Sequence, residues 1–167
     1  PCAPDAMPQR SEVIDIPGNI GLSDTDRAAR IEHIYRPFHN ALASMIAAIT
    51  NPVIVTIHSF TPVFYGQHRA VEIGVLHDRD TRLADAMLSS RSAPISFNIQ
   101  RNQPYGPSEG VTHTLKEHGL AHGHLNVMIE VRNDLIADAP AQTAMAKTLS
   151  SWVTQAITAV GAASCKA

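Results

Sequence analysis

The sequence predicts an α/β fold in which a mainly parallel β-sheet is flanked by helices, within one domain spanning residues 1–167. Short runs of β-branched and other apolar residues alternate along the chain with longer segments whose apolar residues recur at helical spacing. The short runs contain few polar residues, which is typical of strands buried on both faces of a parallel sheet. Ligands bind such sheets beyond the carboxyl ends of the strands, so we expect functional residues there.

The N-terminal region is expected to be extended at first and helical afterwards. Several prolines and a glycine interrupt residues 1–22, which predicts loop or extended chain. Ser23 and Asp26 have the spacing of a capping box at the start of a helix. Apolar residues at helical spacing then continue to Ile49. Pro37 lies within this pattern and is expected to kink or divide the helix.

Strands and helices alternate through the rest of the chain. The expected strands cover residues 52–58, 71–76, 95–99 and 125–131. The expected helices cover residues 81–90 and 138–160, with a loop at 100–110 and a helical turn at 112–118. If all the strands are parallel, the polar residues that follow them gather along one edge of the sheet.

The composition excludes several classes of partner. Charged residues make up 17% of the chain and the formal net charge is −2, which gives no electrostatic reason to bind nucleic acid or an anionic membrane. No apolar run is long enough to span a membrane. Cys2 and Cys165 do not suggest a disulfide framework, so a reducing cytoplasm is expected.

A histidine ends the first apolar strand of the sheet. Residues 53–57 read VIVTI and are followed by His58. A neutral imidazole at this position is suited to bind a metal ion. The alternative is a histidine whose ring bonds a loop carbonyl, and this is the commoner situation for a single buried histidine.

An acidic residue interrupts the last apolar strand. Glu130 lies between Ile129 and Val131, and a carboxylate in such a strand is rarely buried without a partner. One interpretation is a structural ion pair with Arg132, one strand period away on the same face. The other is a general base with a raised pKa that activates water. The pattern of residues favours neither.

Two arginines at strand ends and a histidine-rich segment are the remaining candidates for functional residues. Arg79 and Arg132 are suited to clamp a substrate carboxylate, although for Arg79 alone a solvated loop charge is the commoner situation. The histidine-rich segment matches no standard metal-ligand spacing and contains no HExxH. Its four histidines are His113, His118, His122 and His124. Motifs of serine hydrolases and nucleotide-binding proteins are also absent from the sequence.

Several segments resemble the N-formylglutamate amidohydrolase family. They are, in order, IPGNIGLSDTDRAARI, IYRPFHNAL, IHSFTPV, IGVLHDRDTRLA, NQPY and VMIEVRNDLIAD, spread from Ile16 to Asp138. The resemblance implies a zinc hydrolase with an α/β fold similar to that of zinc carboxypeptidases. It also implies cleavage of the formyl amide of N-formyl-L-glutamate, an acidic small molecule, to formate and glutamate, a step in histidine breakdown.

The resemblance also implies roles for individual residues. His58 of HSFTP corresponds to a zinc ligand, and Glu130 of EVRNDL to the general base and proton shuttle. His118 falls on a position where relatives commonly have histidine, without an assigned role. The positions implied to line the substrate pocket are Arg79, Asn102, Tyr105 and Arg132.

One departure from the family pattern limits these expectations. The family carries a His-containing metal motif followed by an acidic ligand nearer its N-terminus, and no segment here matches it. A catalytic zinc normally has three protein ligands, of which only His58 is identified. We therefore expect the chain to correspond to the C-terminal two-thirds of such an enzyme, without its first strands. On its own it should bind zinc weakly, hydrolyse no N-formylglutamate and tend to form homo-oligomers.

Three readings stay open at this stage. The first is the zinc amidohydrolase just described, and the second is a related enzyme that deacylates a different N-acyl amino acid. The third is a protein without catalysis, either an α/β module that binds an acidic small molecule or an inactive fragment of the enzyme.

Overall fold

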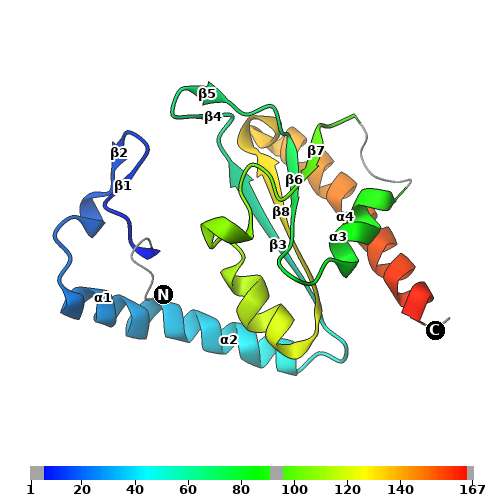
Figure 1. The fold of residues 1–167 in the computed structure, drawn as a ribbon, viewed down its shortest axis with the longest axis horizontal. Helices are drawn as coiled ribbons and strands as arrows, with labels where there is room; N and C mark the ends of the chain where they lie inside the picture. The colour runs from blue at the N-terminus through cyan, green and yellow to red at the C-terminus, as the bar shows by residue number, and fades with distance from the viewer. Residues whose placement is uncertain (1–5, 91–95, 165–167) are drawn as a thin grey trace. The chain divides into compact units, whose positions relative to one another are not determined.

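The computed structural model describes residues 6–90 and 96–164, which belong to two compact units (Figure 1). The first unit is Pro1–Thr50 and the second is Asn51–Ala167. Within the described ranges, no helix combines the length and apolar character that crossing a membrane requires.

The first unit consists of a small hairpin followed by a helical segment. The hairpin strands are β1 (Arg10–Ser11) and β2 (Ile14–Asp15), and a 3-10 turn follows at Pro17–Asn19. The helical segment comprises α1 (Asp24–Arg30), a π-helical stretch η3 (Ile31–Tyr35) and α2 (Arg36–Ala47). The region expected to be extended or looped therefore contains two very short strands.

The helical segment begins and divides where the sequence indicates. The Ser23 side chain accepts a hydrogen bond from the Asp26 backbone N–H at 3.1 Å, and the Asp26 carboxylate accepts one from the Ser23 N–H at 3.2 Å. This is the predicted capping box. Pro37, at the second position of α2, has no N–H to donate, and the regular α-helical pattern is interrupted just before it by η3.

The second unit is built on a four-stranded sheet with the order β3-β8-β6-β7. Its strands are β3 (Val53–Phe60), β8 (Leu125–Arg132), β6 (Ile73–Leu76) and β7 (Ile99–Arg101). A hairpin of β4 (Val63–Phe64) and β5 (Gln67–His68) follows β3. The remaining elements are α3 (Arg82–Ser89), η4 (Pro107–Glu109), η5 (Leu115–Gly119), η6 (Leu120–His122), η7 (Asn133–Ile136) and α4 (Ala139–Ser164).

The sheet is mostly parallel, which confirms the predicted fold class, but one pairing is antiparallel. β3 pairs with β8 and β6 with β7 in parallel, whereas β6 pairs with β8 in antiparallel. The carboxyl ends of β6 and β7 therefore point toward the opposite end of the sheet from those of β3 and β8. The expectation that all the strand ends meet at one edge is corrected by this arrangement.

Two strand boundaries differ from the sequence prediction in ways that affect the site. β3 continues to Phe60 because its last residues still pair with Val131 and Arg132, so His58 lies inside the strand. β7 runs from Ile99 to Arg101, so it shares only Ile99 with the strand expected at 95–99 and extends into the segment expected to be a loop. The expected strand at 95–99 also includes residue 95, which lies outside the described residues.

The hydrophobic core lies between one face of the sheet and the helices α3 and α4. Alternate residues of β6 and β8, including Ile73, Val75, Val127 and Ile129, contribute fully buried side chains to it. Trp152 of α4 is buried among them, and its indole N–H donates a hydrogen bond to the Met87 carbonyl at 2.8 Å. The opposite face of the sheet carries Glu130.

Candidate active site

Glu130 and His58 lie side by side on the same face of the sheet. They are register partners in the parallel pair of β8 and β3, and register partners point to the same side. Glu130 is only 3% exposed, whereas His58 is exposed on the outer strand. The pair therefore combines, on one face of the sheet, a buried carboxyl group with an accessible imidazole.

The carboxyl group of Glu130 has a raised pKa because of its burial. Three neighbours lower the pKa of Glu130: first the hydrogen-bonding side chain of Tyr105, then the electrostatic influence of His58 and of Arg69. Desolvation outweighs them, so the pKa of Glu130 stays above its usual value. Among the described residues, its Oε2 atom has no hydrogen-bond partner. A carboxyl group in this state is suited to accept and release a proton.

Tyr105 is a stable hydrogen-bond donor toward Glu130. Burial, and then the negative charge of Glu130, raise the pKa of the Tyr105 phenol well above its usual value. The hydroxyl therefore keeps its proton at neutral pH. Tyr105, which resemblance placed in the substrate pocket, thus lies beside the candidate base.

A glycine in β6 allows the loop that carries Tyr105 to cross the sheet. Gly74 is the register partner of Glu130 in the antiparallel pair, so both face the same side. A Cβ atom on Gly74 would lie 2.0 Å from the Gln103 carbonyl oxygen. Only glycine permits this approach, and an isolated glycine inside an apolar strand is the signal in the sequence that could have revealed it.

Asn102, the first residue of the NQPY motif, anchors the loop that carries Tyr105. Its side-chain oxygen accepts a hydrogen bond from the His77 backbone N–H at 2.9 Å, and its own N–H donates to the Val75 carbonyl at 3.0 Å. Its φ of 50° is in the left-handed region, which asparagine tolerates better than most residues. The side-chain oxygen of Asn102 is thus engaged in fixing the loop that presents Tyr105.

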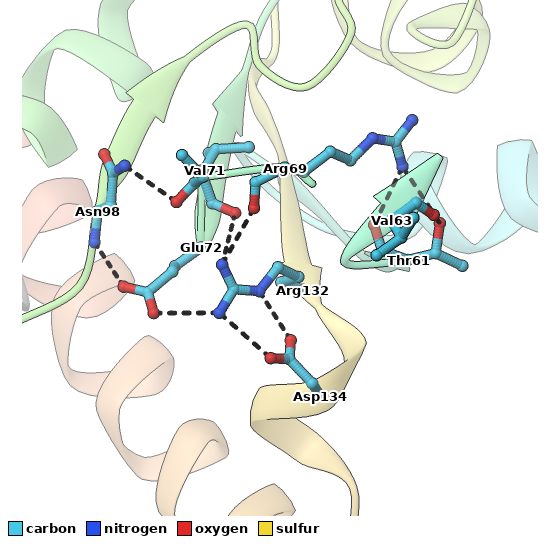
Figure 2. Close-up of polar contacts among 9 residues, drawn as sticks. Thr61, Val63, Arg69, Val71, Glu72, Asn98, Arg132 and Asp134 are labelled. Atoms are coloured by element: carbon cyan, nitrogen blue, oxygen red, sulfur yellow. Dashed lines mark hydrogen bonds and ion pairs between the residues drawn. The ribbon is translucent and has the colours of Figure 1, made fainter. Parts of the chain in front are cut away.

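Arg132 is held by acidic groups of the protein itself (Figure 2). Its guanidinium pairs with Asp134 at 2.8 Å and with Glu72 at 3.3 Å. It also donates to the backbone carbonyls of Arg69 at 3.2 Å and Val71 at 3.5 Å. The ion pair between Glu130 and Arg132, considered as a structural alternative, is not among the ion pairs of the described residues.

Arg79 does not lie at the edge of the sheet where β3 and β8 end. It follows β6, which runs antiparallel to β8, and so belongs to the opposite edge. Its side chain is exposed, and its backbone N–H donates to the Asp78 carboxylate at 2.9 Å. Strand direction depends on long-range connections that the local pattern of residues does not encode, which is why the expected clustering of Arg79 with Arg132 is corrected.

Arg69 belongs to the site although sequence reasoning passed over it. Its guanidinium carbon lies 4.4 Å from the centre of the Phe64 ring, 5.6 Å from that of Phe60 and 5.8 Å from that of Tyr105. Its charge lowers the pKa of both Glu130 and Tyr105. No periodic pattern surrounds it in the segment GQHRA, so the sequence offered no signal.

The described residues do not complete a zinc site. Within residues 6–90 and 96–164, no group of three or more His, Cys, Asp or Glu side chains is placed to hold a metal ion. His58 remains a candidate ligand without two protein partners. Of the histidine-rich segment, His118 is buried in η5, and the rings of His122 and His124 stack with centroids 5.7 Å apart.

Known proteins resemble this chain both in sequence and in fold. A family model described as N-formylglutamate amidohydrolase matches residues 2–137. A gene product of Agrobacterium tumefaciens of known crystal structure is 48% identical, with a TM-score of 0.87 over 95% of this chain and 64% of that one. An N-formylglutamate amidohydrolase from Ralstonia eutropha is 18% identical, with a TM-score of 0.53 over 87% of this chain and 57% of that one. Among curated proteins there is no significant match. The chain thus spans less than two-thirds of these two solved structures.

Proposed function

Because this chain belongs to the N-formylglutamate amidohydrolase family, we propose that it takes part in the hydrolysis of N-formyl-L-glutamate, or of a similar N-acyl amino acid, to formate and the free amino acid. The observation that carries the proposal is the buried Glu130, which has a raised pKa and lies beside Tyr105 and His58. We further propose that the reaction belongs to histidine breakdown and takes place in the cytoplasm. The family resemblance supports the first point and the cysteine usage supports the second.

The proposed reaction assigns one proton-transfer role to Glu130. Its carboxylate accepts a proton from the attacking water, whose oxygen bonds to the formyl carbon. The same carboxyl group then gives that proton to the nitrogen of the amino acid as the carbon–nitrogen bond breaks. Tyr105 keeps its hydroxyl proton, so it can orient the carboxylate or bind the amide oxygen of the substrate.

Zinc is part of the proposal, with His58 as its candidate ligand. A bound zinc ion would polarise the amide carbonyl and acidify water. The described residues do not supply a set of three ligands, so they do not by themselves fit such a centre. The roles proposed for Glu130 and Tyr105 therefore rest on their own burial and contacts.

Replacing Glu130→Gln tests the proposal, because the amide keeps the shape of the side chain and cannot act as a base. In a complete enzyme that contains this chain, formate release should fall by about 10²- to 10⁴-fold. Glu117→Gln is the matched control, since Glu117 is exposed on η5 and removal of its charge should leave turnover unchanged. Unchanged turnover in Glu130→Gln would mean that Glu130 has only a structural role.

A second candidate function is binding of an acidic small molecule without catalysis. It is favoured by the lack of a metal-binding group among the described residues, combined with the arginine close to Glu130. Under this alternative the protein binds dicarboxylates and releases no formate from any N-formyl amino acid. Measuring formate release and ligand binding on the same preparation separates the two functions.

A further inference from the structure

Among the described arginines of the second unit, Arg69 and Arg79 differ from the rest because no ion pair of their guanidinium groups is found. Arg82 pairs with Asp80 at 2.7 Å and Arg101 with Asp85 at 2.5 Å, and Arg132 pairs with two carboxylates. Arg69 has no carboxylate within ion-pair distance among the residues that the structure describes. Its positive charge is therefore available to an anion that is not part of this chain.

The surroundings of the Arg69 guanidinium are aromatic. It lies over the Phe64 ring and near those of Phe60 and Tyr105. Its Nη1 atom donates two long hydrogen bonds to Thr61, at 3.3 Å to the carbonyl and 3.4 Å to the hydroxyl. No bond joins Nε or Nη2 to another group of the described chain, and these two atoms form the edge that binds a carboxylate in a two-bond pair.

The backbone of Arg69 is fixed in place by groups that themselves are anchored. Its N–H donates to the Pro62 carbonyl at 2.8 Å, and its carbonyl accepts from the buried Arg132 at 3.2 Å. Arg132 is in turn held by Glu72 and Asp134. Figure 2 shows the Arg69 side chain extending away from this cluster, toward Thr61 and Val63. A cation on a rigid backbone loses less entropy when it binds a ligand.

The guanidinium also lies near the candidate base. The guanidinium lies near the ring of Tyr105, and Tyr105 in turn interacts with Glu130. The positive charge of Arg69 acts to lower the pKa of both Tyr105 and Glu130. A ligand held by Arg69 would thus lie within reach of the proposed chemistry. Arg79 lies at the other edge of the sheet, and Arg132 is occupied, so neither of these two is placed in the same way.

We propose that Arg69 binds a carboxylate of the acidic substrate and so determines the preference for an acidic N-acyl amino acid, with Arg132 as a positioning residue for the Arg69 backbone. This inference rests on the proposed function for the identity of the substrate, but the binding of a dicarboxylate by Arg69 can be measured without turnover. It replaces Arg79 and Arg132 as the expected carboxylate contact.

The test measures binding of glutarate and of its monoamide, glutaramate, to the purified chain by isothermal titration. Arg69→Met removes the charge and keeps much of the aliphatic length, and should weaken glutarate binding by about 10- to 100-fold. It should weaken glutaramate binding less, because that ligand has one carboxylate instead of two. Lys147→Met, on the exposed surface of α4, is the control for loss of one positive charge and should bind as the unmodified chain does.

The second arm compares turnover of N-formylglutamate with that of N-formylglutamine by a complete enzyme that contains this chain. Arg69→Lys keeps the charge but loses the planar two-bond geometry, so KM should rise more for the acidic substrate than for the neutral one. Equal effects of Arg69→Met on both ligands, or no glutarate binding by the unmodified chain, would overturn the inference. Absence of formate release from every substrate would overturn the proposed function alone, because the binding arm still decides the role of Arg69.

Discussion

At the residue scale, Glu130 shows how burial and neighbouring charges set the state of one carboxyl group. Removal from water favours the neutral acid, while the Tyr105 donor, His58 and Arg69 favour the carboxylate. The result is a pKa above the usual value, which suits the proposed role of accepting and returning a proton. Among the residues that the structure describes, the ion pairs of β8 involve Arg132 and none involves Glu130.

Tyr105→Phe should reduce turnover without unfolding the protein. The substitution removes the donor that faces Glu130 and keeps the ring that packs near Arg69. A hydrogen bond to a charged group contributes roughly 1.5–3 kcal/mol, so we expect kcat to fall at least about 10-fold. Steady-state formate release and a thermal unfolding curve, both measured on a complete enzyme that contains this chain, check this. A large fall in Tm with unchanged kcat would assign Tyr105 to stability alone.

At the scale of elements, the site depends on how one loop crosses one strand. The NQPY loop approaches β6 so closely that Gly74 cannot carry a side chain, and Asn102 ties the start of this loop to His77. Tyr105 reaches Glu130 because residue 74 has no side chain and because Asn102 holds the loop in place. The two short strands β4 and β5 and the anchored Arg132 similarly fix the position of Arg69.

Gly74→Ala should displace this loop, because the new methyl group would lie 2.0 Å from the Gln103 carbonyl oxygen. We expect a loss of about 1–3 kcal/mol in the free energy of unfolding, together with loss of turnover. Gly161→Ala is the matched control: it lies in α4 with nothing within 4 Å of the added carbon and should raise stability by about 0.5–1 kcal/mol. Urea unfolding measures both changes. Equal effects of the two substitutions would contradict the loop assignment.

The sequence predicts the elements of this fold better than their directions. β8 and α4 appear where long apolar patterns place them, since such patterns report burial directly. The antiparallel pairing of β6 with β8 was not predictable, because strand direction is decided by connections across the whole unit. For the same reason Arg69, whose ring contacts come from β3, β4 and the NQPY loop, carries no local signal.

At the scale of the whole molecule, we predict that the outer edge of β3 takes part in self-association. Among the described strands, β3 pairs with β8 alone, and Ile57 on it is 56% exposed. A groove beside it, lined by Val55, Leu149 and Val153 among other residues, runs between β3 and α4. Unpaired strand edges with apolar side chains readily pair with a second copy of the same chain.

Ile57→Lys should therefore reduce self-association of the purified chain, because a charge on an edge strand disfavours pairing of two edges. We expect the mean mass in sedimentation velocity to become less dependent on concentration. Ala144→Lys adds the same charge to an exposed position of α4 and should leave association unchanged. A chain that is monomeric before substitution, at all concentrations, would refute the prediction.

The parallel pairing of β3 with β8 has a consequence for the order in which the protein folds. The paired residues are roughly 70 positions apart in the chain, so this contact closes a long loop and is expected to form late. During synthesis β3 leaves the ribosome well before its partner exists. Pulse-labelled hydrogen exchange should then show β3 amides protected after those of α4. The step that brings His58 beside Glu130 would thus be among the last, so that the protein acquires its proposed chemistry only as folding is completed.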